Sequence, residues 1–251
     1  MSNHTSTSQK LHENLGNLIA SKKPGERLPS EPVLAQQLGV SRATLREAMR
    51  TFETQGLIRR RQGAGTYVSH PSYVIESGLE VLESIETMAE RIGLPVSMGE
   101  LKVESRVATE EEINNLGLLP HSNVTQISRV IHAEGRPVAY LIDLVPVDIL
   151  TPEDFSSDFT GSVLDLFLRR GAPDLVSSRC EINAVTASHK VARALGIQRG
   201  DVLLWFGAIL YSAVGTIVDY SFSYFLPGYF RFHVVRRVGD VTSSHSWAGS
   251  S

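Results

Sequence analysis

The chain has 251 residues, of which 42% are hydrophobic and 20% are charged, as in ordinary folded domains. This length is enough for two modest domains, each with its own core. No apolar run is long enough to span a membrane, and the polar segment from Met1 to Gln9 lacks the apolar core of a signal peptide. We therefore expect a cytoplasmic protein with no membrane partner.

Cysteine content and charge distribution narrow the class further. Cys180 is the only cysteine, so no intrachain disulfide can form, which fits a reducing compartment. The net charge is −3, but residues 1–75 contain ten Lys or Arg and five Asp or Glu, whereas the remainder contains fourteen and twenty-two. A basic first third on an acidic body is typical of a DNA-binding domain joined to a domain that does not bind DNA.

Residues 30–56 predict two helices joined by a tight turn. Ser30 and Ser41 are suitable N-caps, and Gly39 and Gly56 can end the helices because glycine adopts the left-handed conformation at low cost. Apolar residues recur at intervals of three and four and predict the buried faces: Val33, Leu34 and Leu38 in the first helix, then Leu45, Ala48, Met49 and Phe52 in the second.

Two short β-prone runs follow, at residues 57–61 and 66–68, and a segment with two glycines joins them. Two helices and a hairpin in this order predict a winged helix-turn-helix, which places its second helix in a DNA major groove. Arg59–Arg61 would then form a wing that contacts phosphates, with Arg60 as a candidate contact. The alternative is that this run is only a solvated surface segment.

The start of the second helix carries residues suited to reading DNA. Arg42 and Arg46 lie four apart on one helical face, and arginine can donate two parallel hydrogen bonds to guanine. Thr44 can bond to a phosphate or contact a thymine methyl group. The alternative for both arginines is ordinary charge on a helix surface.

Residues 10–70 resemble the DNA-binding domain of the GntR family of bacterial transcriptional regulators. The matching segments are Pro24–Glu31, Leu38–Arg42, Thr44–Arg46, Gly56–Ile58 and Gly63–Val68. The resemblance implies DNA contacts from Ser41, Arg42, Thr44, Arg46, Gln62 and Gly63. Two departures leave the operator sequence open: Pro32 stands where many members have an arginine, and Ala43 where a threonine is usual.

Residues 71–78, which include Pro71, predict a linker. An amphipathic helix is expected from Leu79 to Ile92, ending at Gly93. Its apolar stripe could line a ligand pocket or simply pack into a core. Further on, residues 151–154 predict the start of a short helix, and Ser162 to Arg169 predict another, with these residues facing inward: Val163, Leu164, Phe167 and Leu168.

The rest of the chain to Val238 repeats itself at a period near 80 residues. Each copy contains a capped helix, a strand, a turn with glycine and a second strand; the copies span residues 108–146 and 185–227. Thr109 and Glu112 match a capping box in the first copy. Two such copies predict one antiparallel sheet with helices packed on it.

This second part, roughly residues 76–238, resembles the UTRA effector-binding domain of the HutC subfamily. The best matching segments are Ala133–Pro137, Asp219–Ser221 and Tyr229–Phe232. The resemblance implies a fold similar to chorismate lyase, binding of a small metabolite, and dimerisation. We thus predict an α+β protein with a winged helix-turn-helix at 8–70, a linker at 71–78, a UTRA domain at 79–238 and a disordered tail at 239–251.

The resemblance also suggests effector-binding residues. Members that bind phosphorylated sugars are similar in having two arginines on one strand; here Arg129 keeps the first, and Ile131 occupies the position of the second. Leu141 stands where a glutamate is common on the next strand. The implied set is Arg129, Asp143, Asp219, Ser221, Ser223 and Tyr229. One arginine can bind a carboxylate or phosphate, so a carboxylate or phosphorylated metabolite is expected, with a preference for a less charged ligand. Alternatively, Arg129 forms a structural ion pair, and the two aspartates are surface or hairpin polarity.

The leading functional hypothesis is a regulator, in most relatives a repressor, that binds a palindromic double-stranded operator as a homodimer under control of an effector. We identify no catalytic set, metal site or cofactor motif. An enzyme, suggested by the lyase-like fold, and a purely architectural DNA-binding protein are the alternatives.

Overall fold

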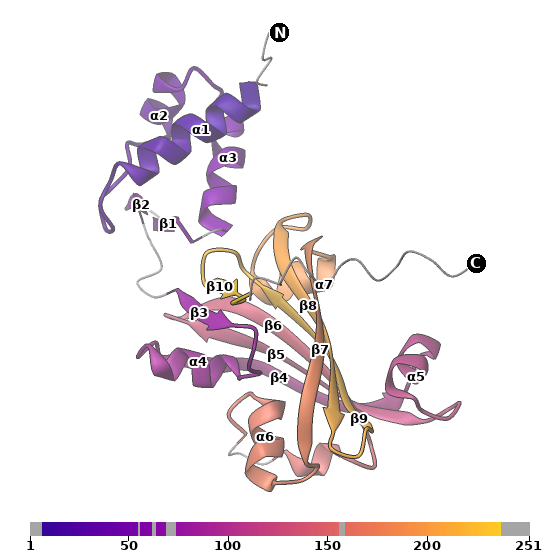
Figure 1. The fold of residues 1–251 in the computed structure, drawn as a ribbon. Coiled ribbons are helices and arrows are strands. Elements are labelled where there is room, and N and C mark those ends of the chain that lie inside the picture. Colours follow the sequence, from indigo (N-terminus) through magenta and orange to yellow (C-terminus); the bar gives the residue numbers. More distant parts are fainter. Residues whose placement is uncertain (1–6, 55, 62–63, 69–73, 156–158, 237–251) are drawn as a thin grey trace, which may run out of the picture.

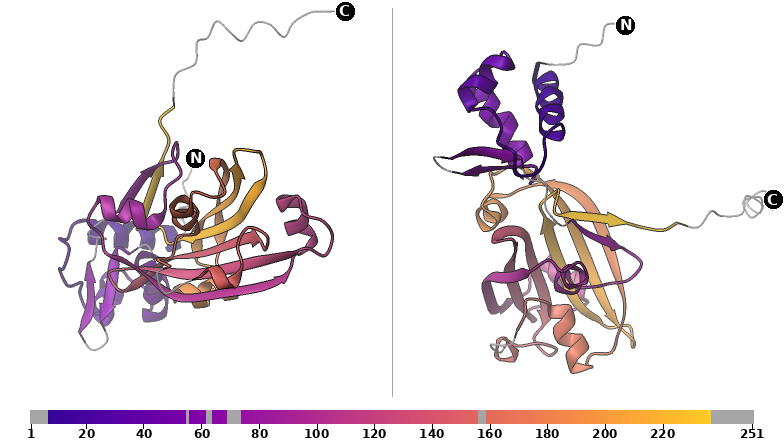
Figure 2. Two further views of the ribbon diagram at one scale, coloured as in Figure 1. Left: turned by 90° about the horizontal axis from the view of Figure 1, so that it is seen from below. Right: turned by 90° about the vertical axis from the view of Figure 1, so that its left-hand side faces the viewer.

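The computed structural model describes residues 7–54, 56–61, 64–68, 74–155 and 159–236. A small, mainly helical domain lies at one end of a larger domain built on a six-stranded sheet (Figure 1). The right-hand view of Figure 2 shows the two domains one above the other. The expected disordered tail and the tip of the first hairpin, Gln62 and Gly63, lie outside the described residues.

The N-terminal domain is the predicted winged helix-turn-helix. Its elements are α1 (Thr7–Ala20), α2 (Glu31–Gln37), α3 (Arg42–Thr54), β1 (Ile58–Arg61) and β2 (Gly65–Val68). β1 and β2 pair antiparallel. Leu45 and Met49 of α3 are fully buried against α1 and α2, as the helical spacing predicts.

Local chemistry explains the ends of the two predicted helices. The Ser41 hydroxyl accepts the Thr44 amide at 3.1 Å and caps α3, whereas Ser30 occupies the cap position of α2 without a side-chain hydrogen bond. Gly39 and Gly56 follow the helices with φ of +66° and +70°. These positive angles favour glycine, because a Cβ would crowd the backbone.

The larger domain contains one antiparallel sheet with strand order β4-β5-β6-β9-β8-β7. The strands are β4 (Val96–Val107), β5 (Asn123–Ala133), β6 (Arg136–Pro146), β7 (Leu175–Thr186), β8 (Val202–Ser212) and β9 (Ile217–Phe225). Helices pack on both faces, so the domain is α+β, as predicted.

The sheet confirms the internal repeat. The first copy contributes β4, α5 (Glu110–Leu116), β5 and β6, and the second contributes β7, α7 (His189–Leu195), β8 and β9. Both helices are capped by a hydroxyl, and both end at a left-handed glycine, Gly117 or Gly196. The copies meet where β6 pairs with β9 in the middle of the sheet.

Each face of the sheet carries its own helices. α4 (Ile85–Arg91) and α6 (Val163–Arg170) cover one face, and Phe167 of α6 packs against Ile127 and Val145. α5 and α7 lie on the other face, where Leu116 of α5 packs near Leu144. A short 3-10 turn, η1 (Pro152–Asp154), stands at the predicted start of a helix.

Three local predictions differ from the structure. Residues 75–78, expected in a linker, form β3 (Ile75–Gly78), which pairs parallel with β10 (Phe230–His233). The helix expected from Leu79 begins only at Ile85, because Ser84 caps it by accepting the Thr87 amide at 3.0 Å. Leu168, expected to face inward, is 59% exposed, since the buried face of this short helix is satisfied by Val163 and Phe167.

One ion pair among the described residues joins the two domains. Arg50, near the end of α3, points its guanidinium at Asp201 in the loop before β8, with 3.5 Å between Nη2 and Oδ1. The same guanidinium is 2.8 Å from Glu47 on its own helix. The recognition helix is therefore connected to the larger domain through a polar contact.

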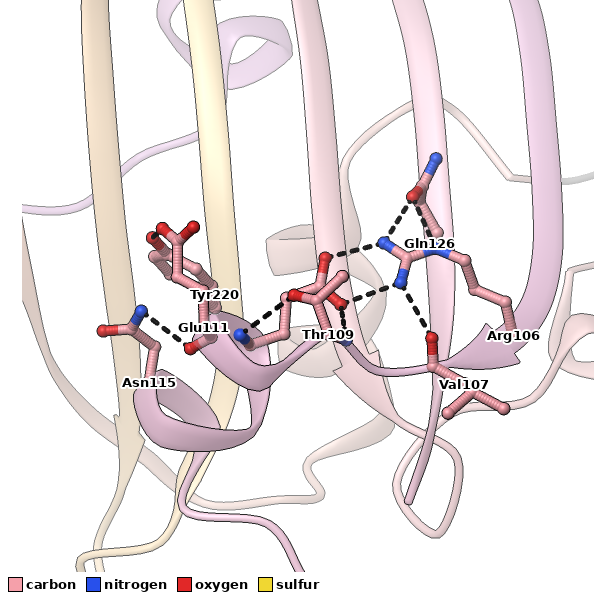
Figure 3. Close-up of polar contacts among 8 residues, drawn as sticks. Arg106, Val107, Thr109, Glu111, Asn115, Gln126 and Tyr220 are labelled. Atoms are coloured by element: carbon pink, nitrogen blue, oxygen red, sulfur yellow. Dashed lines mark hydrogen bonds and ion pairs between the residues drawn. The ribbon is translucent and has the colours of Figure 1, made fainter. Parts of the chain in front are cut away.

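The helix α5 is attached to the sheet by a polar network (Figure 3). Arg106 on β4 donates to both carboxylate oxygens of Glu112, at 2.8 and 2.7 Å, and to Gln126 on β5 at 2.7 Å. Glu112 also accepts the Thr109 amide at 2.8 Å, which completes the predicted capping box. Glu112 thus joins the helix end to Arg106 of β4, and Arg106 extends the network to Gln126 of β5.

Glu112→Gln should lower the free energy of unfolding by about 1–2 kcal/mol at pH 7, because it removes charge-assisted hydrogen bonds. The Arg106 guanidinium holds the pKa of Glu112 below its ordinary value. A carboxylate with a lowered folded-state pKa contributes stability above its unfolded pKa and loses it on acidification. Urea denaturation should therefore show the difference from the parent shrinking below about pH 4. Glu110→Gln, an exposed change in the same turn, is the control; an equal effect from both would contradict the role of the network.

Candidate functional site

The start of α3 presents the residues expected to read DNA. Ser41, Arg42 and Thr44 are exposed there. The Ser41 and Thr44 hydroxyls lie 2.8 Å apart, so both support the helix cap as well as facing solvent. Within the described part of the chain, the side chain of Arg42 has neither a hydrogen-bond nor an ion-pair partner. Its guanidinium is therefore available to an external acceptor.

Arg46 and Arg60 lie together around one carboxylate that the sequence interpretation did not single out. Glu31, at the start of α2, is 2.6 Å from Arg46 Nε and 4.0 Å from Arg60 Nη1. Arg60 also donates to the Arg46 carbonyl at 3.3 Å and is 3.5 Å from Glu53. These contacts connect both helices of the helix-turn-helix with β1. No local pattern marks Glu31, because its partners lie 15 and 29 residues away.

The structure brings together three of the predicted effector residues. Arg129 on β5 is 5% exposed and donates from Nη1 to Asp143 on β6 and from Nε to the Gly161 carbonyl. Asp219 on β9 is also 5% exposed and lies close enough to interact with both charges of this pair. The alternative prediction of a structural ion pair at Arg129 is thus observed. The alternative prediction that the two aspartates are surface residues is wrong, because both are buried. We call Arg129, Asp143 and Asp219, together with Glu86 of α4, the Arg129 cluster.

Burial governs the protonation of Asp219. Burial raises the pKa of Asp219 well above its usual range, and the neighbouring Asp143 carboxylate adds to this rise. Hydrogen bonds from Ser221 and the Leu144 backbone, and the charge of Arg129, act in the opposite direction. The Asp219 side chain is therefore costly to ionise while the site holds a single cation.

Glu86 on α4 is a member of the cluster that sequence reasoning missed. Burial raises the pKa of its carboxyl, opposed by a backbone hydrogen bond and by Arg129, while Asp165 and Asp143 raise it further. Its Oε1 is buried without a hydrogen-bond partner among the described residues. The apolar stripe of the expected helix was predicted either to line a ligand pocket or to pack into a core, and Ile85 and Met88 lie in the core. Glu86 was not part of that stripe.

The remaining predicted residues lie at different distances from the cluster. Ser221 and Ser223 pair across the sheet with Asp143 and Leu141, so they share the face of the cluster. Tyr229 is buried in the hydrophobic core that also contains Ile131 and Leu141. For the described residues, no polar contact connects the Tyr229 hydroxyl to Arg129.

A separate open hollow of about 440 Å³ lies on the opposite face of the sheet. Its polar end is the Arg106 network, where the charges are already paired, and its floor is aromatic. The lining residues are Arg106, Glu112, Gln126, Ile142, Leu144, Trp205, Phe222 and Tyr224. The sequence interpretation did not predict this hollow.

Family comparisons agree with both halves of the fold. The model for bacterial regulatory proteins of the gntR family matches residues 7–68, and the UTRA domain model matches residues 92–231. The chain belongs to the GntR family of bacterial transcriptional regulators. Its UTRA domain places it with the HutC-type members of that family. Among the described residues, no helix is long and apolar enough to cross a membrane.

Individual relatives support this assignment. The chain is 30% identical over 199 residues to the HTH-type transcriptional repressor NagR of Bacillus subtilis, covering 79% of this chain and 81% of that protein. It is 28% identical over 184 residues to the histidine utilization repressor of Pseudomonas putida, covering 72% and 71%. The fold is similar to the crystal structure of PhnF from Mycobacterium smegmatis, with a TM-score of 0.63, 21% identity, and coverage of 91% and 100%.

Gly161→Ala should destabilise the fold by about 1–3 kcal/mol. Gly161 has φ of +117°, and a Cβ placed there would lie 2.7 Å from Glu86 Oε1. The new methyl group would therefore push apart Glu86 and the carbonyl that holds Arg129. Gly171→Ala is the matched control, because its φ is +65° and no atom lies within 4 Å of the added Cβ. Its loss should be about 1 kcal/mol. Equal losses in thermal unfolding would contradict close packing around Glu86.

Proposed function

We propose that this protein is a repressor that binds a palindromic operator as a homodimer and releases it when a small molecule occupies the Arg129 cluster. The observation that carries the DNA-binding half is the exposed Arg42 at the start of α3, whose guanidinium has no partner among the residues that the structure describes. Helix-turn-helix proteins read bases with this part of the second helix. We infer that Ser41, Thr44, Arg46, Arg60, Gln62 and Gly63 complete the contact surface.

Arg46 and Arg60 support this surface in a second way. Both are held by Glu31 in the free protein, and Arg60 is held by Glu53 as well. Salt bridges of exposed or partly exposed groups contribute about 0–1 kcal/mol, so a DNA phosphate can replace the carboxylate at little cost. The carboxylates would then keep the arginines extended without preventing DNA binding.

The buried polar cluster supports the effector half of the proposal. Burying charged groups in the core of a sheet costs desolvation free energy, and a purely architectural DNA-binding protein has no need for such groups. Ser221 and Ser223 border the same face, whereas Tyr229 would contribute its buried ring to the apolar side. The expected carboxylate or phosphorylated ligand depended on a free Arg129. Because Arg129 is paired with Asp143, its charge is not free for an anionic ligand.

Ligand control requires the effector to favour one placement of the winged domain over another. The polar contact of Arg50 with Asp201 offers a route, because it connects α3 to the effector domain and can be broken at low cost. We place the protein in the cytoplasm, where the operator is accessible. An enzyme is the weaker reading, since the relatives carry the names of regulators.

Arg42→Ala should weaken operator binding 10- to 100-fold, because one bidentate arginine–guanine contact contributes about 1–3 kcal/mol. The operator would first be selected from random DNA, and affinity then measured by mobility shift at fixed salt. Arg169→Ala, an exposed arginine on α6, is the control and should bind normally. Unchanged affinity for Arg42→Ala would reject the assignment of α3 as the reading helix.

The homodimer predicts two chains on each operator. Sedimentation of the free protein should show twice the chain mass, and titration of the selected operator should saturate at two chains per duplex. A duplex with only one half-site should bind at least 10-fold more weakly, because the second recognition helix loses its base contacts. One chain per full operator, or equal affinity for both duplexes, would contradict the dimer.

A further inference from the structure

We propose that the Arg129 cluster takes an organic cation, an ammonium or imidazolium compound, which pairs with the carboxylates of Asp219 and Glu86. This inference rests on the proposed function, because it names the class of effector that the regulator binds. The first observation is the ratio of cationic to acidic side chains in the cluster. One arginine stands among three carboxyl groups in the cluster, from Glu86, Asp143 and Asp219, and Asp165 lies near enough to act on Glu86.

The positive charge of the cluster is already used. Arg129 donates to Asp143 and to the Gly161 carbonyl, and its side chain is almost fully buried. An anionic ligand would have to displace Asp143 and then lie beside two further carboxyl groups. Burial already makes these two carboxyl groups costly to ionise, and a neighbouring anion would make their ionisation costlier still, whereas a cation stabilises their ionised form.

Two buried acceptor atoms lack a partner. Glu86 Oε1 and Asp219 Oδ1 are buried and form no hydrogen bond with the described residues. Buried polar atoms in native proteins are nearly always satisfied, so each such exception requires an explanation. Burial favours the protonated form of both carboxyl groups in the free protein. Once binding releases that proton to solvent, a carboxylate only accepts hydrogen bonds, so its partner in the complex must be a donor. An N–H group carrying positive charge supplies both the donor and the countercharge.

The two carboxyl groups approach the ion pair from different elements. Asp219 comes from β9, while Glu86 comes from α4, which packs over this face of the sheet. Glu86 Oε1 lies against Gly161, whose carbonyl holds Arg129, and Ile131 and Met98 also border Gly161. The surroundings are thus acidic on one side and apolar on the other.

This mixed lining favours an organic cation over a metal ion. A divalent metal prefers several oxygen ligands converging on one point. Within the described ranges, no three acidic, histidine or cysteine side chains are arranged to hold a metal. An ammonium or imidazolium group on a carbon skeleton can use the carboxylates with its charged end and Ile131 and Leu141 with its apolar part.

The cluster also predicts proton release on binding. Burial raises the pKa values of Asp219 and Glu86; Asp143 raises both, Asp165 raises that of Glu86, and Arg129 lowers both. A bound cation would stabilise the ionised carboxylates and lower these pKa values. Binding of a ligand whose own charge is constant should therefore strengthen as pH rises.

Matched probes of opposite charge test the ligand class. Thermal unfolding of the full chain would be followed with millimolar putrescine or histamine, and with the dicarboxylate succinate as the anionic counterpart of putrescine, at equal ionic strength. We expect the cations to raise the melting temperature by several degrees. The shift with putrescine should be larger at pH 8 than at pH 6. Stabilisation by succinate, or no stabilisation by either the cations or succinate, would overturn the proposal.

Substitutions locate the response. Asp219→Asn and Glu86→Gln should each remove most of the putrescine shift, whereas Asp148→Asn, an exposed aspartate outside the cluster, should retain it. Circular dichroism would establish that each variant is folded. If Asp219→Asn does not fold, the partly exposed Glu86 gives the decisive variant. A full shift in folded Glu86→Gln would show that the cation binds elsewhere and would overturn the proposal.

Operator binding separates failure of this inference from failure of the proposed function. Release of the operator by putrescine would support both. Release by succinate or inorganic phosphate, without an effect of the cations, would retain the regulator and reject the cationic effector. A thermal shift with putrescine that Glu86→Gln removes, but with unchanged operator affinity, would support the cation site and reject ligand-controlled DNA binding.

Discussion

The buried ion pair between Arg129 and Asp143 is the interaction on which the effector domain depends. It joins β5 to β6 inside one sheet face and holds the Gly161 loop through the same guanidinium. Removing either partner from such a pair costs about 3–5 kcal/mol, because a buried charge is left uncompensated. The charge of Arg129 favours ionisation of Asp219 and Glu86, whereas Asp143 opposes it, so this ion pair affects both the core and the proposed ligand site.

The repeat explains how these groups come together. Each copy supplies a strand to the centre of the sheet, and the β6–β9 pairing places Asp143 opposite Ser221. Residues almost 80 positions apart therefore share a face at the boundary between the copies. A site at such a boundary can respond to a ligand by small shifts of either half. The helix α4 packs over the same face of the sheet.

The winged domain has its own hydrophobic core. The described ion pair that connects it to the effector domain, between Arg50 and Asp201, contributes little stability by itself. Little free energy is then needed to move the winged domain from one placement to another. The change in DNA affinity cannot exceed the difference in ligand affinity between the two placements. The Glu31 contacts with Arg46 and Arg60 act within the winged domain alone. They keep the arginines positioned, whereas the effector domain would determine when two copies can meet one operator.

The amino-acid sequence by itself determined the features that depend on nearby residues. The capped α3, the hairpin, the capping box at Thr109 and the repeated helix–strand–strand unit were all predicted, because their interactions span few positions or recur along the chain. Tertiary structure alone decided the rest. The pairing of β3 with β10 joins segments about 155 residues apart, and Glu86 enters the Arg129 cluster only because α4 packs on a sheet formed later in the chain. Neither the four residues of β3 nor the single carboxylate of Glu86 carries a local signal of its partner, since packing between distant segments selects these partners.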